Sequence, residues 1–287
     1  MGEMFSSQSL SFETNYDTLW CDNQGNAASD TVYCAPSGSQ HKTWFGGNPD
    51  LEPEEGESLT VGTVWNVTDT LSMEVSYYKV KIDNRIAAIS TDRLLSDEIE
   101  NGSNPAVVRD AEGKIDVMYS FDQNMASLET SGFDFKANYT HETNIGDFSL
   151  RGEASYVEEF VEITEAGADP FDYSGLQDYP EWRANMTLDW KYDNFGAAWS
   201  TYYIGKQESG AEEFNYDALA PVPSYFKHNA QVSYTHDWNG KVTFGVNNIF
   251  DREAPKWYDG FYDYRDASTA LYDVLGRTIF LKVEQTF

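Results

Sequence analysis

The chain has 287 residues and carries 19 Lys and Arg against 48 Asp and Glu, which gives a formal net charge of −29. This balance excludes a basic nucleic-acid-binding surface as the dominant feature. Aromatic residues make up 15% of the chain, too many for a disordered acidic protein. No apolar run approaches the ~18 residues of a membrane helix, so a helical membrane protein is excluded as well.

The N-terminal segment has neither a basic stretch nor a long apolar stretch, so it is not a secretory signal. We expect either a cytoplasmic protein or a piece of a longer chain. A first strand is predicted near Leu10 to Thr18, and a long connection follows from Leu19 to Ser58.

Two cysteines, Cys21 and Cys34, lie in this connection and are separated by a polar stretch. Neither has a second cysteine or a histidine at zinc-finger spacing, so a structural zinc site is not expected. Two free thiols or one disulfide remain, and the polar surroundings favour the disulfide. A Cys21–Cys34 disulfide would indicate an oxidising compartment.

Short and long connections alternate along the rest of the chain. Short links of turn-forming residues are predicted at Thr68 to Thr70, Thr143 to Gly146, Asp193 to Asn194 and Asp237 to Gly240. Further long connections are predicted at Asp83 to Ala126, Val161 to Tyr179, Gln207 to Val222 and Asp251 to Leu275. This alternation predicts about ten antiparallel strands in an up-and-down meander that forms one structural unit.

Strict alternation of apolar and polar residues identifies the strands. The clearest case runs from Trp182 to Tyr192, and the segment from Ile279 to Phe287 repeats it with Phe280 and Gln285 as exceptions. Looser alternation occurs at Phe133 to Thr140, Lys227 to Thr235 and Val242 to Phe250. Helical spacing is not sustained over a comparable length, so the chain is predicted to be all-β.

Two architectures produce such strands. A soluble β-sandwich has strands of about 5 or 6 residues and connections that are long at either end. Here the segments are closer to the about 9 to 11 residues that a tilted strand needs to cross a bilayer, and all long connections fall on one side. Trp and Tyr also gather near the segment ends, as in the aromatic girdles of membrane barrels. We therefore predict an antiparallel up-and-down transmembrane β-barrel.

The sequence shows no catalytic pattern. The four histidines, His41, His141, His228 and His236, lack a spacing that would clamp a metal, and no serine lies in a nucleophile-elbow motif. The many carboxylates give paired-carboxylate hydrolysis no specific support. We expect no enzymatic activity, no metal site and no cofactor.

The best local candidate for ligand binding is the run from Trp257 to Asp266, which is dense in rings and carboxylates. Rings stack on sugars or on planar catechol-like ligands, and an arginine pairs with a carboxylate or phosphate. A self-packed extracellular loop is the alternative. The candidate ligand-binding residues are Trp257, Tyr258, Phe261, Tyr262, Tyr264 and Arg265.

Four separated motifs carry a family resemblance. They are Asn48 to Glu54, Leu128 to Asp134, Val246 to Glu253, and the C-terminal segment from Tyr272 to Phe287. In this order they resemble the C-terminal part of a TonB-dependent outer-membrane receptor. The most specific motif is Asn-Asn-Ile-Phe-Asp, residues 247–251, which is similar to the family's Asn-Asn-Leu-Phe-Asp.

The resemblance implies a part of a larger molecule. Family members enclose an N-terminal plug in a barrel of about 22 strands, so about ten strands make slightly under half of one. Residues 1–287 are therefore expected to be the C-terminal part of the barrel, with the plug domain and N-terminal strands absent. The chain would then be a fragment, a truncated gene product or one part of a split receptor.

The resemblance also implies a function, which is energised uptake of a scarce solute, such as an iron-siderophore or a carbohydrate, across the outer membrane of a Gram-negative cell. The long loops would be extracellular. Expected partners are outer-membrane lipid, the missing strands and plug, the TonB system through that missing part, and a small-molecule ligand, but no nucleic acid. A non-energised outer-membrane binding or adhesion barrel and a soluble β-sandwich binding protein are the alternatives.

Overall fold

The computed structural model describes residues 2–22, 30–164, 168–209, 220–238, 240–258 and 265–285. None of the helices in these ranges is long and apolar enough to span a membrane. The sequence predicts one structural unit, but the chain divides into two. Unit 1 consists of Met1–Glu57, Lys81–Leu128 and Glu162–Pro170, and unit 2 consists of Ser58–Val80, Glu129–Val161 and Phe171–Phe287.

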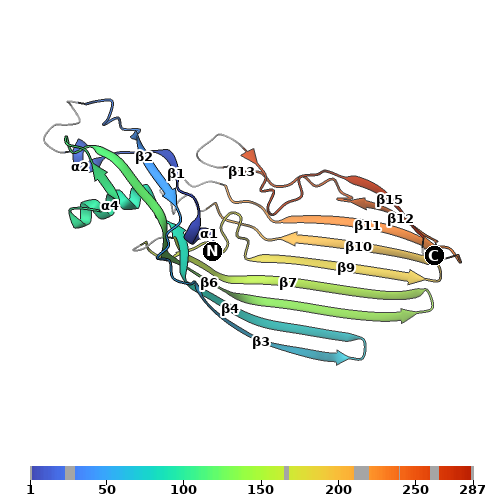
Figure 1. The fold of residues 1–287 in the computed structure, drawn as a ribbon. Coiled ribbons are helices and arrows are strands. Elements are labelled where there is room, and N and C mark those ends of the chain that lie inside the picture. The colour runs from blue at the N-terminus through green and yellow to red at the C-terminus, as the bar shows by residue number, and fades with distance from the viewer. Residues whose placement is uncertain are drawn as a thin grey trace. The chain divides into compact units, whose positions relative to one another are not determined.

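The long strands form one sheet, and sequence neighbours lie side by side in it (Figure 1). Their bounds are β3 Glu55–Thr68, β4 Leu71–Ala88, β6 Ile115–Thr143, β7 Gly146–Ile163, β9 Trp182–Tyr192, β10 Phe195–Ile204, β11 Tyr225–Thr235, β12 Gly240–Asn247 and β15 Thr278–Gln285. All pairs from β7–β9 to β12–β15 are antiparallel. The predicted up-and-down meander is confirmed, and the strand predicted from Trp182 to Tyr192 is β9.

Short turns join the strands of unit 2 where turn-forming residues predict them. They connect β3 to β4, β6 to β7, β9 to β10 and β11 to β12. Asp193 in the β9–β10 turn has a φ of 51°. Gly146 begins β7 with a φ of 119°, and a Cβ there would lie 2.6 Å from the backbone oxygen of Lys191. Only glycine fits this position without displacing the neighbouring strand.

The strand register separates an apolar face of unit 2 from a polar face. One row of paired residues across the sheet is Leu150, Leu188, Trp199, Ala230, Val246 and Ile279. The neighbouring row, one residue along, is Arg151, Thr187, Ser200 and Asn229. Many side chains of the apolar face are exposed, among them Leu188 at 40% and Leu281 at 68%. Such an exposed apolar face opposite a polar face is what a bilayer-facing strand requires.

The two exceptions in the last strand have structural partners. Phe280 pairs with Gly245 across β12 and β15, and its ring lies where a Cβ on Gly245 would stand. An aromatic ring that covers a glycine in this way stabilises a strand pair. The Gln285 side chain donates a hydrogen bond to the Trp238 carbonyl oxygen at 3.1 Å.

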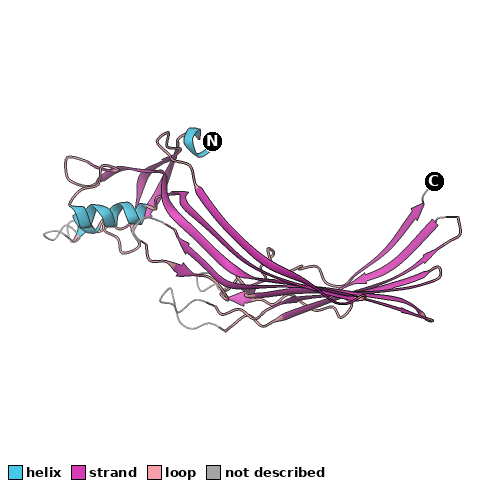
Figure 2. Ribbon diagram, turned by 90° about the horizontal axis from the view of Figure 1, so that it is seen from below, coloured by secondary structure: helices cyan, strands magenta, loops and turns pink. Residues whose placement is uncertain are grey.

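Unit 1 contains all the described helices, whereas unit 2 consists of strands, turns and loops (Figure 2). The elements of unit 1 outside the long strands are α1 Gly2–Phe5, β1 Ser9–Asn15, α2 Thr18–Cys21, β2 Ser39–Gly46, α4 Thr91–Asn101 and β5 Val107–Arg109. The first predicted strand forms as β1, but it does not join the meander. It pairs antiparallel with β2, and β2 runs parallel to the first part of β6.

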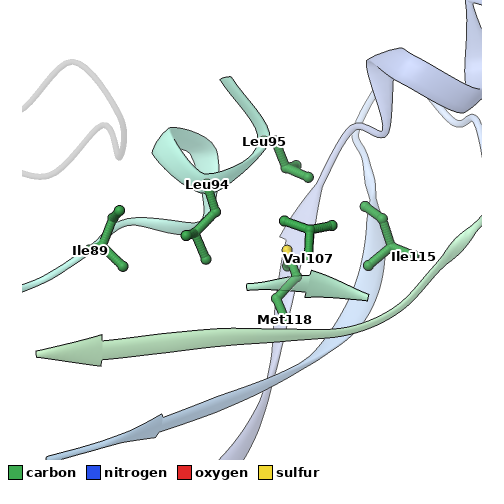
Figure 3. Packing of buried hydrophobic residues seen from close by; sticks show 6 residues of the cluster. All are labelled: Ile89, Leu94, Leu95, Val107, Ile115 and Met118. Carbon is green, nitrogen blue, oxygen red and sulfur yellow. The ribbon is translucent and has the colours of Figure 1, made fainter. Parts of the chain in front are cut away.

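The core of unit 1 explains why the chain forms a second unit. Leu94 and Leu95 of α4 gather with Ile89, Val107, Ile115 and Met118, and all six are buried (Figure 3). The sequence predicts an all-β chain, but α4 is a helix with ordinary start and stop signals. The Ser90 hydroxyl oxygen accepts a hydrogen bond from the Arg93 N–H at 3.1 Å, and Gly102 ends the helix with a φ of 77°.

Two more connections carry short strands. β8, Phe171–Asp172, pairs with β7, and four rings, Phe160, Phe171, Tyr173 and Tyr179, pack together in this part of unit 2. β13, Trp257–Tyr258, and β14, Arg265–Asp266, form a separate antiparallel pair.

Candidate functional site

Cys21 and Cys34 are joined by a disulfide, as predicted. Both residues are buried, with 1% and 7% of their surface exposed. Cys21 ends α2, whose N-cap is Asp17, and Cys34 directly follows Tyr33. The bond therefore holds Asp17 and Tyr33 close to each other in unit 1.

Arg109 links the disulfide-bonded segment around Asp17 to α4. Its guanidinium group donates two hydrogen bonds to the Asp17 carboxylate, at 2.9 and 3.0 Å, and two to the Glu98 carboxylate, at 2.8 and 2.7 Å. A further Nη1 hydrogen bond reaches the Gly113 carbonyl oxygen at 2.7 Å. All five N–H donors of the side chain are therefore used. Asp17 and Glu98 are buried, so this group is a structural junction with no free donor for a ligand.

Burial and hydrogen bonds shift the pKa values of three titratable groups around the junction, Asp17, Tyr33 and His41. Burial raises the pKa of the Tyr33 hydroxyl, which also donates a hydrogen bond to Asp17 at 2.7 Å. Burial by itself would raise the pKa of Asp17, but hydrogen bonds from Arg109 and Tyr33 reverse the effect and lower it. Burial lowers the pKa of His41, whose ring packs edge-on against Tyr33. The junction therefore favours an ionised Asp17 and a neutral His41.

Loss of the disulfide is expected to loosen unit 1. The bond spans a sequence separation of 13, and closing a loop of this size stabilises a protein by roughly 3 kcal/mol, mainly by restricting the unfolded chain. A double Cys21→Ser, Cys34→Ser variant should therefore be cleaved by protease in unit 1 at lower urea concentration. Alkylation followed by mass spectrometry should label both cysteines only after reduction. Labelling of both under native, non-reducing conditions would contradict the bond.

The predicted ligand-binding run is described only in part. Phe261, Tyr262 and Tyr264 lie outside the described residues. Trp257 and Tyr258 belong to β13, and Arg265 belongs to β14, with Tyr258 paired to Arg265. Ligand binding by these six residues stays a prediction.

The polar face of unit 2 carries a cavity of about 370 Å³. Four neighbouring strands, β7, β9, β10 and β11, form its floor, and the connection between β12 and β15 contributes Ala270, Leu271 and Asp273. The strand register sets its polar groups in rows. Asn185 pairs with Glu153 and Tyr202, and Tyr202 pairs with Lys227. Arg183 lies two residues from Asn185 along β9 and also lines the cavity.

Two cations and two carboxylates line this cavity. The Lys227 Nζ lies 3.1 Å from an Asp273 carboxylate oxygen and 5.4 Å from the centre of the Tyr202 ring. The Asn185 amide donates a hydrogen bond to Glu153 at 3.3 Å. Arg183 makes no salt bridge with any residue in the described part of the chain. The arrangement suits an anion that also carries an apolar ring.

The connection over the cavity is anchored through Tyr272. The Gln207 side-chain amide donates a hydrogen bond to the Tyr272 hydroxyl at 2.7 Å, and both residues are buried. The Tyr225 ring packs edge-on against Tyr272 at 5.3 Å, and burial raises the pKa of Tyr272. The Gln207 side-chain oxygen also accepts the Asp178 N–H at 2.8 Å. Asp178, Gln207 and Tyr272 belong to three different connections between strands of unit 2, and all three connections therefore meet at the buried Gln207 side chain.

The Asn-Asn-Ile-Phe-Asp motif forms the turn where β12 ends. Asn248 is buried with a φ of 51°, and its side chain accepts a hydrogen bond from the Arg252 N–H and donates one to the Arg252 carbonyl oxygen. The Asp251 carboxylate accepts the Arg277 N–H at 2.7 Å, just before β15 begins. The motif thus fixes both ends of the connection that lies over the cavity.

Sequence reasoning missed this cavity. Alternation predicts a polar face for Arg183 and for Lys227, but the signal that brings them together is the register of three strands, which alternation does not fix. Asp273 belongs to a long connection whose path no local pattern predicts.

Solved structures that share the fold include three receptors or transporters. The siderophore receptor PirA from Acinetobacter baumannii is 16% identical, with a TM-score of 0.58 over 86% of this chain and 34% of the receptor. A mutant of the ferric enterobactin receptor PfeA from Pseudomonas aeruginosa is 17% identical, with a TM-score of 0.58 over 88% of this chain and 33% of the receptor. The FrpB iron transporter from Neisseria meningitidis is 13% identical, with a TM-score of 0.52 over 82% of this chain and 30% of that protein.

At such identities the likeness concerns the fold alone, and the chain spans about a third of the length of these proteins. No curated protein matches the chain by sequence. The family model described as TonB dependent receptor-like, beta-barrel matches residues 2–249. Since this match covers most of the sequence, the chain belongs to the TonB-dependent receptor-like β-barrel family.

Proposed function

We propose that the chain forms the C-terminal wall of an outer-membrane receptor that imports a scarce solute with energy from the TonB system. Family membership implies the outer membrane. The apolar face, on which Leu188 is exposed, supports contact with lipid, and the polar row through Thr187 supports a wet lumen. The role is transport and not catalysis.

The cavity on the polar face is the observation that carries the proposal. A chain with a net charge of −29 places Arg183 and Lys227 beside the Tyr202 ring on a face that a solute would pass. Cations beside a ring attract anionic, ring-bearing solutes. The solved relatives named above are receptors or transporters for siderophores or iron. A ferric siderophore fits the chemistry of this cavity better than an uncharged carbohydrate does.

The edges of the sheet support the proposal that this wall belongs to a larger barrel. Among the described residues, β3 pairs with β4 alone and β15 pairs with β12 alone. Lipid cannot satisfy the N–H and C=O groups of an open edge. We propose that further N-terminal strands pair with both edges of the sheet. A plug domain would make the contact with TonB.

The connections give the proposed orientation. The short turns face the periplasm, and the long connections, including the one that carries Asp273, face the outside of the cell. Unit 1, with its disulfide, is then formed by extracellular segments, where an oxidised cysteine pair is stable.

Uptake of radiolabelled ferric siderophores by iron-limited cells tests the proposal. Deletion of the gene and deletion of TonB should each abolish uptake, whereas cells that lack only TonB should still bind the solute at the surface. Binding that persists together with uptake that ignores TonB would identify a non-energised binding barrel. Siderophore binding that is unchanged by deletion of the gene would contradict the proposal that the solute is a ferric siderophore.

A further inference from the structure

The cavity on the polar face of unit 2 has the groups of an anion-binding site, and a side chain of the protein itself occupies part of it. Tyr202 of β10 lies between the two strands that supply the cations, Arg183 from β9 and Lys227 from β11. Tyr202 is 44% exposed, so its ring can be covered by another ring. Two cations that flank an exposed ring form a site for an aromatic anion, because one partner stacks while the others pair with the charge.

Asp273 occupies the place of such an anion. Among the described residues that line the cavity, it is the carboxylate in contact with Lys227, and its side chain also accepts the Leu275 N–H at 3.0 Å. The Leu275 N–H and Lys227 lower the pKa of Asp273, so this carboxylate is ionised at neutral pH. With Glu153 and Asp273 opposite Arg183 and Lys227, the charges in the lining balance. Displacement of Asp273 would leave one excess positive charge.

The contact is weak enough to be displaced. The Asp273 side chain is 40% exposed and the Lys227 side chain is 18% exposed, and partly exposed ion pairs contribute little stability. The residues on either side of this contact are held more firmly. Tyr272 is buried against Gln207, and the Arg277 N–H donates its hydrogen bond to Asp251. A displacement is thereby confined to residues 273–276.

We propose that Arg183, Lys227 and Tyr202 bind an aromatic anion of the transported solute, and that Asp273 occupies Lys227 until this anion displaces it. The inference rests on the proposed function, because it names the chemical group of the solute that this wall recognises. Solute binding thereby releases Asp273 from the cavity and lets residues 274–276 move with it, while Tyr272 and Arg277 stay in place.

Salicylate and its neutral analogue salicylamide test the site, with the protein produced from its own gene and assayed in outer membranes. Salicylate should bind and salicylamide should not. Asp273→Asn should tighten salicylate binding about two- to fivefold, as expected for removal of a partly exposed competing charge. Lys227→Gln and Arg183→Gln should each weaken it about tenfold or more. Lys191→Gln, a matched change on the polar face outside this cavity, should leave it unchanged.

A fluorescent label at Leu275→Cys reports the release, since this side chain is 65% exposed. Salicylate should shift its emission in the otherwise unchanged protein, and Asp273→Asn should show the shifted emission without salicylate. Equal binding of salicylate and salicylamide, or no difference between the Lys227→Gln and Lys191→Gln variants, would overturn the inference. Failure of siderophore uptake with intact salicylate binding would refute the proposed function alone.

Discussion

Replacement of Arg109 by alanine is expected to destabilise unit 1 by about 3–5 kcal/mol, because it leaves two buried carboxylates without their cation. The side chains of Asp17 and Glu98 are 1% and 6% exposed. Arg109→Lys should recover only part of the loss, since an ammonium group cannot bind two carboxylates in bidentate fashion. Protease cleavage of unit 1 across a urea series measures the change in the free energy of unfolding.

Arg93→Ala is the matched control in the same unit. Arg93 pairs with Asp97 one turn along α4, and both side chains are about a quarter exposed at 24% and 25%. A pair of this kind contributes about 0.3–0.5 kcal/mol. Equal effects of the Arg109 and Arg93 substitutions would contradict the structural role of the junction.

The second large effect is expected on β9. Leu188→Arg should cost about 2–4 kcal/mol, because the charge would face hydrocarbon near the middle of the membrane. Thr187→Arg should cause only a small loss of stability, because Thr187 faces the polar side, where its hydroxyl contacts the Ser200 hydroxyl at 3.1 Å. Heat-modifiable migration of the protein from outer membranes reports the folded fraction of each variant. Similar losses for both would mean that β9 does not border lipid.

Much of unit 2 was predictable because its strands lie between two different solvents. Alternation over Trp182 to Tyr192 reflects lipid on one face and water on the other, and this contrast sets the strand bounds directly. The turns at Asp193 and Gly146 follow from residues that accept a positive φ. The disulfide was also within reach, since the chain has only two cysteines and they lie close in sequence.

Unit 1 and the cavity were less accessible to sequence reasoning. α4 lies inside a long connection, and its start and stop signals at Ser90 and Gly102 are local, so the alternation of the strands does not predict it. The parallel pairing of β2 with β6 joins segments far apart in sequence, which no local pattern specifies. The Lys227–Asp273 contact likewise depends on the path of a long connection.

Refolding of the 287-residue chain alone in detergent micelles tests most directly whether this sheet is one wall of a larger barrel. The unpaired edges of β3 and β15 in the described part of the chain predict that the isolated chain gives no closed, ion-conducting species, and that co-expression with N-terminal strands and a plug restores a heat-modifiable barrel. A compact, protease-resistant form of the chain alone that conducts ions in planar bilayers would contradict the account.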